Sequence, residues 1–146
     1  MNIPASSIQH TNFSINCSGR LVDLNTPKIM GILNLTPDSF SDGGKFNNEK
    51  SALLQVGKML KDGADFIDIG AQSTRPNAEY LSAEEEIRRI GNVISLIKKE
   101  FPEALISIDT FYADVVKFGY NEGMDVVNDI SGGYFDENLL PTVAET

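Results

Sequence analysis

Short apolar runs alternate along this chain with longer segments whose apolar residues recur at helical spacing. Four of the runs have the near-continuous hydrophobicity of strands that are covered on both faces. Ahead of them, the segment Phe13–Leu24 alternates around Ser18-Gly19, which is typical of a hairpin. The four predicted strands are Ile29–Leu33, Asp65–Gly70, Leu105–Ile108 and Asp125–Val127.

A segment with helical spacing follows each predicted strand. Ser82 to Glu85 matches a capping box, and the isoleucines after it share one helical face as far as the Lys98-Lys99 pair. Gly63 and Gly123 supply C-terminal stops for other helices. The predicted helices run from Asn47 or Asn48 to Asp62, from Ser82 to Lys99, from about Tyr112 to Tyr120, and from near Glu137 onward.

Four βα units in strict order predict a parallel α/β fold. Polar residues follow every strand, at Asn34, Gly70 to Arg75, Asp109-Thr110 and Asn128-Asp129, and this favours a (β/α)8 TIM barrel, whose active site lies at the carboxyl ends of its strands. A doubly wound sheet is the alternative, although it needs polar residues only beside its switch point. A complete barrel takes about 250 residues. We therefore expect residues 1–146 to be the N-terminal half of a single barrel domain, apparently truncated.

Composition narrows the classes of partner. The 146 residues are 41% hydrophobic, enough for one core, and the net charge of -9 argues against a nucleic-acid surface. No stretch approaches the roughly 18 apolar residues of a membrane span, and the first residues lack the features of a signal peptide. Cys17 alone cannot form an internal disulfide. We expect a cytoplasmic protein that binds neither nucleic acid nor membrane.

The segment Ile29–Phe46 is the most informative part of the chain. Its apolar strand pattern stops at Asn34 and gives way to a loop of carboxylate, hydroxyl and glycine residues. Such a loop can hold a cation and a phosphate, because both need oxygen ligands or N–H donors close together. An ordinary polar turn after a buried strand is the alternative for a loop of this composition.

Four motifs together resemble the signatures of the dihydropteroate synthase family, in family order and at similar spacing. They are Asn34 to Gly44 (NLTPDSFSDGG), Asp68 to Pro76 (DIGAQSTRP), Ser107 to Thr110 (SIDT) and Val127 to Gly132 (VNDISG). The resemblance implies a (β/α)8 barrel that condenses 6-hydroxymethyl-7,8-dihydropterin diphosphate with 4-aminobenzoate in folate synthesis and releases pyrophosphate. It also implies a target for sulfonamides, which mimic 4-aminobenzoate.

In the first loop, the resemblance implies that Asn34 is a ligand of Mg²⁺, which prefers hard oxygen donors. It implies that Asp42 approaches the metal when substrates are bound. Phe40 matches an aromatic residue beside the aminobenzoate, although a hydrophobic anchor for the loop is an equal alternative.

In the second loop, Thr74 matches a diphosphate-binding position, Arg75 lies beside it, and Pro76 shapes the aminobenzoate pocket. Two residues depart from the family pattern: Gln72 stands where many members have Glu, and Asn77 where many have Gly. We expect these changes to alter the charge and backbone of the loop without removing a ligand contact.

Asp109 and Asn128 match the residues that bind the pterin. A carboxylate accepts hydrogen bonds from the ring N–H groups, and an amide both donates and accepts. We also expect Asp109 to steady the cation that develops as the C–O bond to diphosphate breaks. Asp68 and Asp129 are expected to make structural hydrogen bonds only.

Two alternatives stay open. One is another pterin barrel, of the methyltetrahydrofolate-dependent methyltransferase type, although methyl transfer has no diphosphate for the first loop to hold. The other is a non-catalytic half-barrel that binds pterin or assembles with a partner. The family also uses an Asp, a Lys and an Arg from later strands, and residues 1–146 contain no match to them. We therefore expect the chain alone to be inactive. A homodimer of the complete protein is compatible with the resemblance.

Overall fold

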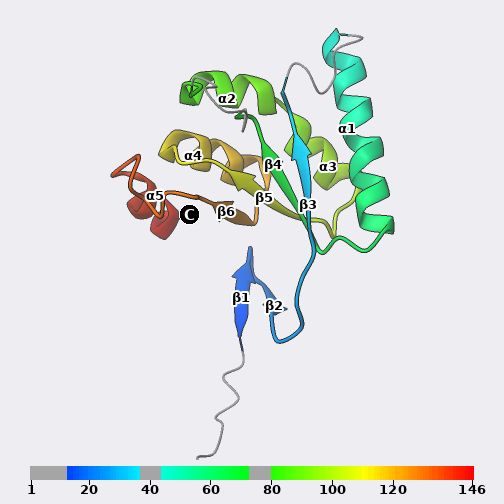
Figure 1. The fold of residues 1–146 in the computed structure, drawn as a ribbon, viewed down its shortest axis with the longest axis horizontal. Coiled ribbons are helices and arrows are strands. Elements are labelled where there is room, and N and C mark those ends of the chain that lie inside the picture. Colours follow the sequence, from blue (N-terminus) through cyan, green and yellow to red (C-terminus); the bar gives the residue numbers. More distant parts are fainter. Residues whose placement is uncertain (1–12, 37–43, 73–79) are drawn as a thin grey trace, which may run out of the picture.

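The strands form two separate sheets in the computed structural model, which describes residues 13–36, 44–72 and 80–146. A hairpin of β1 (Ser14–Cys17) and β2 (Arg20–Asp23) comes first. A parallel sheet follows, in the order β3-β4-β5-β6 (Figure 1). Its strands are β3 (Met30–Asn34), β4 (Phe66–Gly70), β5 (Leu105–Asp109) and β6 (Val126–Asn128), which confirms the four predicted strands to within one residue at each end.

The helices are α1 (Gly44–Lys61), α2 (Ala83–Ile90), α3 (Val93–Glu100), α4 (Ala113–Glu122) and α5 (Leu139–Glu145). The prediction of one continuous helix from Ser82 to Lys99 is wrong. Gly91 takes φ 53° and ψ -127°, outside the helical region, while its N–H still bonds the carbonyl of Ile87. A residue with a side chain rarely adopts such a backbone, so Gly91 ends α2 and the chain restarts as α3. No helix in the described part of the chain is long and apolar enough to cross a membrane.

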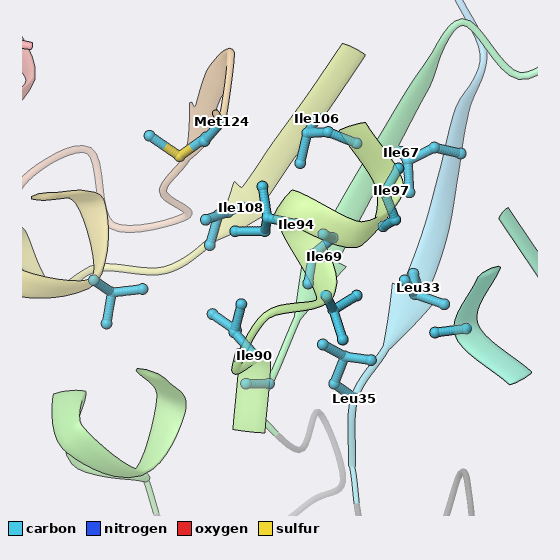
Figure 2. Close-up of a cluster of buried hydrophobic side chains, with 14 of the residues drawn as sticks. Leu33, Leu35, Ile67, Ile69, Ile90, Ile94, Ile97, Ile106, Ile108 and Met124 are labelled. Carbon is cyan, nitrogen blue, oxygen red and sulfur yellow. The ribbon is translucent and has the colours of Figure 1, made fainter. Parts of the chain in front are cut away.

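The helices cover one face of the parallel sheet. Alternate residues of each strand point to that face, and there Leu33, Ile67 and Ile106 are fully buried. Figure 2 shows Ile69 and Ile108 of the sheet gathered with apolar side chains of the helices. The helical side of this cluster includes Ala52, Val56, Ile90, Ile94, Ile97, Val115, Val116 and Leu139.

The opposite face carries the polar residues, and the hairpin covers its beginning. Cys17 is buried with Phe66 and Leu105, the first residues of β4 and β5. Figure 1 shows the hairpin beyond the amino ends of the parallel strands. An ion pair of 2.8 Å between Arg20 and Glu103 also ties the hairpin to the turn before β5. The hairpin thus covers this face at the amino ends of the strands and leaves the carboxyl ends open.

The strand order also bears on the choice between a barrel and a doubly wound sheet. Each strand pairs with the strand that follows it in sequence, without reversal, and helices from α1 to α5 contribute to one core on one face. A doubly wound sheet has helices on both faces and a point where the order reverses. The observed arrangement is that of consecutive units of a (β/α)8 barrel, with the uncovered face inward.

Candidate active site at the strand ends

One row of residues joins the carboxyl ends of all four parallel strands. The register pairs Asn34 with Gly70, Gly70 with Asp109, and Asp109 with Asn128. A Cβ atom on Gly70 would lie 3.5 Å from Oδ1 of Asn34 and 3.9 Å from Oδ2 of Asp109. Glycine at this position therefore leaves the space between the two side chains open. The sequence predicted this convergence, and three of the predicted site residues are neighbours in it.

Asp109 lies in an environment that disfavours its charged form. Burial raises the pKa of its carboxyl, and the carboxylates of Asp68 and Asp129 raise it further. A cation or an N–H donor that reached Asp109 would relieve this repulsion and hold the carboxylate ionised. The end of β5 is therefore suited to bind a cation or a ligand with hydrogen-bond donors.

Asp68 orients Asn128 from one layer deeper in the same face. Its Oδ2 accepts a hydrogen bond of 3.1 Å from Nδ2 of Asn128. Because the amide NH₂ group is engaged by Asp68, the amide oxygen is left to face a ligand. Oδ1 of Asp68 and the hydroxyl of its neighbour Ser107 are buried without a hydrogen-bond partner among the described residues. The layer under Asp109 and Asn128 thus holds two polar atoms that are not satisfied by the described part of the protein.

Asp129 has a structural role in the turn after β6. Its carboxylate accepts from the backbone N–H groups of Ser131 and Gly133, at 2.8 and 2.5 Å, and from the Ser131 hydroxyl at 3.0 Å. Burial acts to raise its pKa, but these hydrogen bonds outweigh it and hold the pKa below the ordinary value. This agrees with the prediction of structural hydrogen bonding.

Five other predicted site residues lie outside the described residues: Phe40, Asp42, Thr74, Arg75 and Pro76. The structure describes the two ends of the second loop, at Ala71-Gln72 and at Tyr80-Leu81. The first end is hydrogen-bonded to Glu86 and Arg89 of α2. The second contacts Phe111 and Tyr112, the two residues just before α4. The positions of the five residues relative to Asn34, Asp109 and Asn128 stay predictions.

Sequence reasoning missed Glu86, a fully buried carboxylate on α2. It bonds the side chains of Gln72 and Thr110, which come just after the carboxyl ends of β4 and β5. A signal was present, since Glu86 is four residues before Ile90 and eight before Ile94 and so lies on the apolar face of the helical pattern.

The described strand ends offer oxygen ligands of the kind that Mg²⁺ prefers. No group of three or more His, Cys, Asp or Glu that could hold a metal is found among residues 13–36, 44–72 and 80–146. Mg²⁺ bound to a diphosphate needs only one or two protein oxygens, because waters and phosphate oxygens complete its shell. Asn34 offers an exposed amide oxygen at the strand end, with Asp109 across the open Gly70 position. This donor set fits such an ion.

A parallel sheet with helices on one face and a polar row at its carboxyl ends defines part of an enzyme-type (β/α)8 barrel. The chain belongs to the pterin binding enzyme family, whose model matches residues 30–146. The dihydropteroate synthase of Haemophilus influenzae is 49% identical over 113 residues, which are 77% of this chain and 41% of that protein. A mitochondrial folate synthesis bifunctional protein of Arabidopsis thaliana is 49% identical over 124 residues, which are 84% of this chain and 22% of that protein.

Solved structures agree with the family match. The dihydropteroate synthase of Xanthomonas albilineans, solved with 4-aminobenzoic acid, superposes with a TM-score of 0.81 at 36% identity, over 90% of this chain and 48% of that one. The enzyme from Clostridium difficile, solved in the presence of pteroic acid, gives 0.76 at 46% identity, over 81% of this chain and 44% of that one. These neighbours confirm the predicted barrel class. The chain spans about half the length of the structures it matches.

Proposed function

We propose that the protein containing this chain is a dihydropteroate synthase. It condenses 6-hydroxymethyl-7,8-dihydropterin diphosphate with 4-aminobenzoate to 7,8-dihydropteroate and pyrophosphate. The observation that carries the proposal is the row of Asn34, Asp109 and Asn128 across the strand ends, with Gly70 keeping the space between them open. Relatives named for folate synthesis or as dihydropteroate synthase support it.

Asp109 and Asn128 would bind the pterin edge. The ring presents N–H donors next to nitrogen acceptors, and the carboxylate of Asp109 accepts from such donors. The amide oxygen of Asn128 accepts as well, since Asp68 engages its NH₂ group. The charge of Asp109, which is half-buried, then stabilises the cation that forms as the C–O bond to diphosphate breaks, and this stabilisation is larger in a partly desolvated site than in water.

Asn34 would hold Mg²⁺ through its amide oxygen, and Asp42 would approach the same ion. When bound, the metal neutralises charge on the departing diphosphate. Thr74 and Arg75 would bind the diphosphate, and we assign the pocket for 4-aminobenzoate to Phe40 and Pro76. These roles rest on the family motifs.

A cytoplasmic location stays a prediction, because the names of two plant relatives include the word mitochondrial. The predictions that the protein does not bind nucleic acid and that the complete protein forms a homodimer also remain to be tested. We expect the complete protein to bind sulfonamides in the 4-aminobenzoate pocket, because sulfonamides mimic 4-aminobenzoate.

The test is an assay of pyrophosphate release by the complete gene product. Release that requires both the pterin diphosphate and 4-aminobenzoate, and that depends on Mg²⁺, supports the proposal. Methyl transfer from methyltetrahydrofolate without pyrophosphate release would replace it with the methyltransferase alternative. Pterin binding without any turnover would replace it with the non-catalytic one.

A further inference from the structure

A buried hydrogen-bond network links the second loop to the pterin-side strand ends. At its centre is Glu86, which is 0% exposed. One carboxylate oxygen accepts from Nε2 of Gln72, and the other accepts at 2.8 Å from the hydroxyl of Thr110. A fully buried carboxylate is costly unless it is hydrogen-bonded, so its presence calls for a reason beyond packing.

On one side, the network closes the base of the second loop. Oε1 of Gln72 accepts at 3.0 Å from the N–H of Leu81, and Nε2 of Gln72 donates to the carbonyl of Leu81 at 3.4 Å. That carbonyl also accepts at 2.7 Å from the hydroxyl of Tyr112, next to α4. Arg89 of α2 donates to the carbonyl of Ala71 at 3.1 Å. Gln72 and Leu81, on either side of the segment 73–79, are thereby bonded to each other, and the two ends of the loop are bonded to α2 and to Tyr112 just before α4.

On the other side, the network reaches Asp109 and Asn128. Thr110, which bonds Glu86, directly follows Asp109 and is 1% exposed. Its N–H donates at 3.0 Å to the carbonyl of Asn128, and its hydroxyl accepts from the N–H of Tyr112 at 3.2 Å. A displacement of Glu86 would therefore act on both residues that we assign to the pterin.

We propose that Glu86 is a positioning residue, which with Gln72 and Thr110 fixes the base of the second loop relative to Asp109 and Asn128. The hydrogen bonds of Glu86 are observed in the structure, whereas the expected effect of Glu86 on turnover rests on the proposed function. An apolar side chain at position 86 would fill the space but would bond neither Gln72 nor Thr110.

The amide of Gln72 suits this role because it donates to the carboxylate at any pH. Burial raises the pKa of Glu86 and Asp109 acts in the same direction, whereas the hydrogen bonds from Thr110 and Gln72 and the charge of Arg89 oppose them. Among the described residues Tyr112 also faces Glu86, and the charge of Glu86 contributes to raising the pKa of the Tyr112 hydroxyl. A glutamate at position 72 would bond Glu86 only while the pair of carboxyl groups keeps a proton.

The test is the hydrogen-exchange protection factor of the Leu81 amide, measured by NMR on ¹⁵N-leucine-labelled protein. The factor is compared between pH 5.5 and pH 8. We expect the same factor at both values for the wild type. For Gln72→Glu we expect a factor about tenfold lower at pH 8 than at pH 5.5, since a buried charged hydrogen bond is lost. The exchanged pair Gln72→Glu with Glu86→Gln restores one amide and one carboxylate, so it should again be independent of pH. Gln55→Glu, the same charge change at an exposed position of α1, is the control.

Equal protection of Leu81 at both pH values in Gln72→Glu would overturn the network. So would a pH-dependent loss of the same size in Gln55→Glu. If Gln72→Glu does not fold at pH 8, Thr110→Val and Thr110→Ser answer the same question at one pH, because only the serine keeps the hydroxyl. In a complete protein with synthase activity, Thr110→Val should lower kcat while Thr110→Ser retains it. Unchanged kcat in Thr110→Val would overturn the positioning role, whereas absence of activity in the wild type would overturn only the proposed function.

Discussion

Gly119 lies where α4 packs on β5, the strand that ends at Asp109. A Cβ atom at this position would lie 2.4 Å from Cδ1 of Ile108 and 3.1 Å from the sulfur of Met124. Carbon atoms in contact are normally about 3.5–4.0 Å apart, so Ile108, which is fully buried, would have to move. By helix propensity alone, Gly119→Ala would stabilise the protein by about 1 kcal/mol. Overpacking of a core costs about 1–3 kcal/mol, so after the helix-propensity gain we expect a net loss of about 0–2 kcal/mol.

A double-mutant cycle isolates this contact. Ile108→Val removes Cδ1 and should cost about 0.5–1.5 kcal/mol alone. In that background Gly119→Ala should be neutral or stabilising, which gives a coupling of about 1–3 kcal/mol. Urea denaturation of the four proteins gives the four free energies of unfolding. If the two substitutions add within about 0.5 kcal/mol, the described packing of α4 on β5 is wrong, and the placement of Asp109 loses its support.

Three further predictions concern the strand ends and the cap of α4. Asn34→Ala in the complete protein should weaken Mg²⁺-dependent diphosphate binding, measured by calorimetry with magnesium varied, because it removes a hard oxygen ligand; unchanged magnesium dependence would refute this. Asp109→Asn should lower kcat about tenfold or more, which corresponds to ~1.4 kcal/mol of lost transition-state stabilisation. The KM for 4-aminobenzoate should change little. Asp114→Asn, on the exposed side of α4, is the control. Asp136, whose Oδ2 accepts from the first N–H of α4 at 2.8 Å, has its pKa lowered mainly by that bond. Its contribution is therefore present above its ordinary pKa and lost as the pH falls, so Asp136→Ala should cost about 1 kcal/mol at pH 7 and less at pH 3; an equal cost at both values would contradict the assignment.

The sequence predicts the strands and their polar ends because both depend on local patterns. A buried parallel strand needs a continuous apolar run, and a polar residue after it marks the carboxyl end. Asn34, Asp109 and Asn128 were placed by this reasoning, and the register aligns them in one row.

The break between α2 and α3 could not be predicted in the same way. The isoleucines continue at helical spacing across Gly91, and a single glycine within a helix costs only about 1 kcal/mol. The burial of Glu86 was missed for a related reason. It follows Glu84 and Glu85 in a first turn where acidic residues are common at the surface. Its spacing from Ile90 and Ile94 indicates the apolar face, but the partners that satisfy its carboxylate, Gln72 and Thr110, are known only from the tertiary structure.

The most direct test of the central claim is a crystal structure of the complete protein with the pterin diphosphate bound. We predict that ring N–H groups lie within hydrogen-bond distance of the Asp109 carboxylate and of the Asn128 amide oxygen, while Nδ2 of Asn128 keeps its bond to Asp68. A pterin bound away from this row, or an Asn128 amide turned so that its oxygen faces Asp68, would contradict the account.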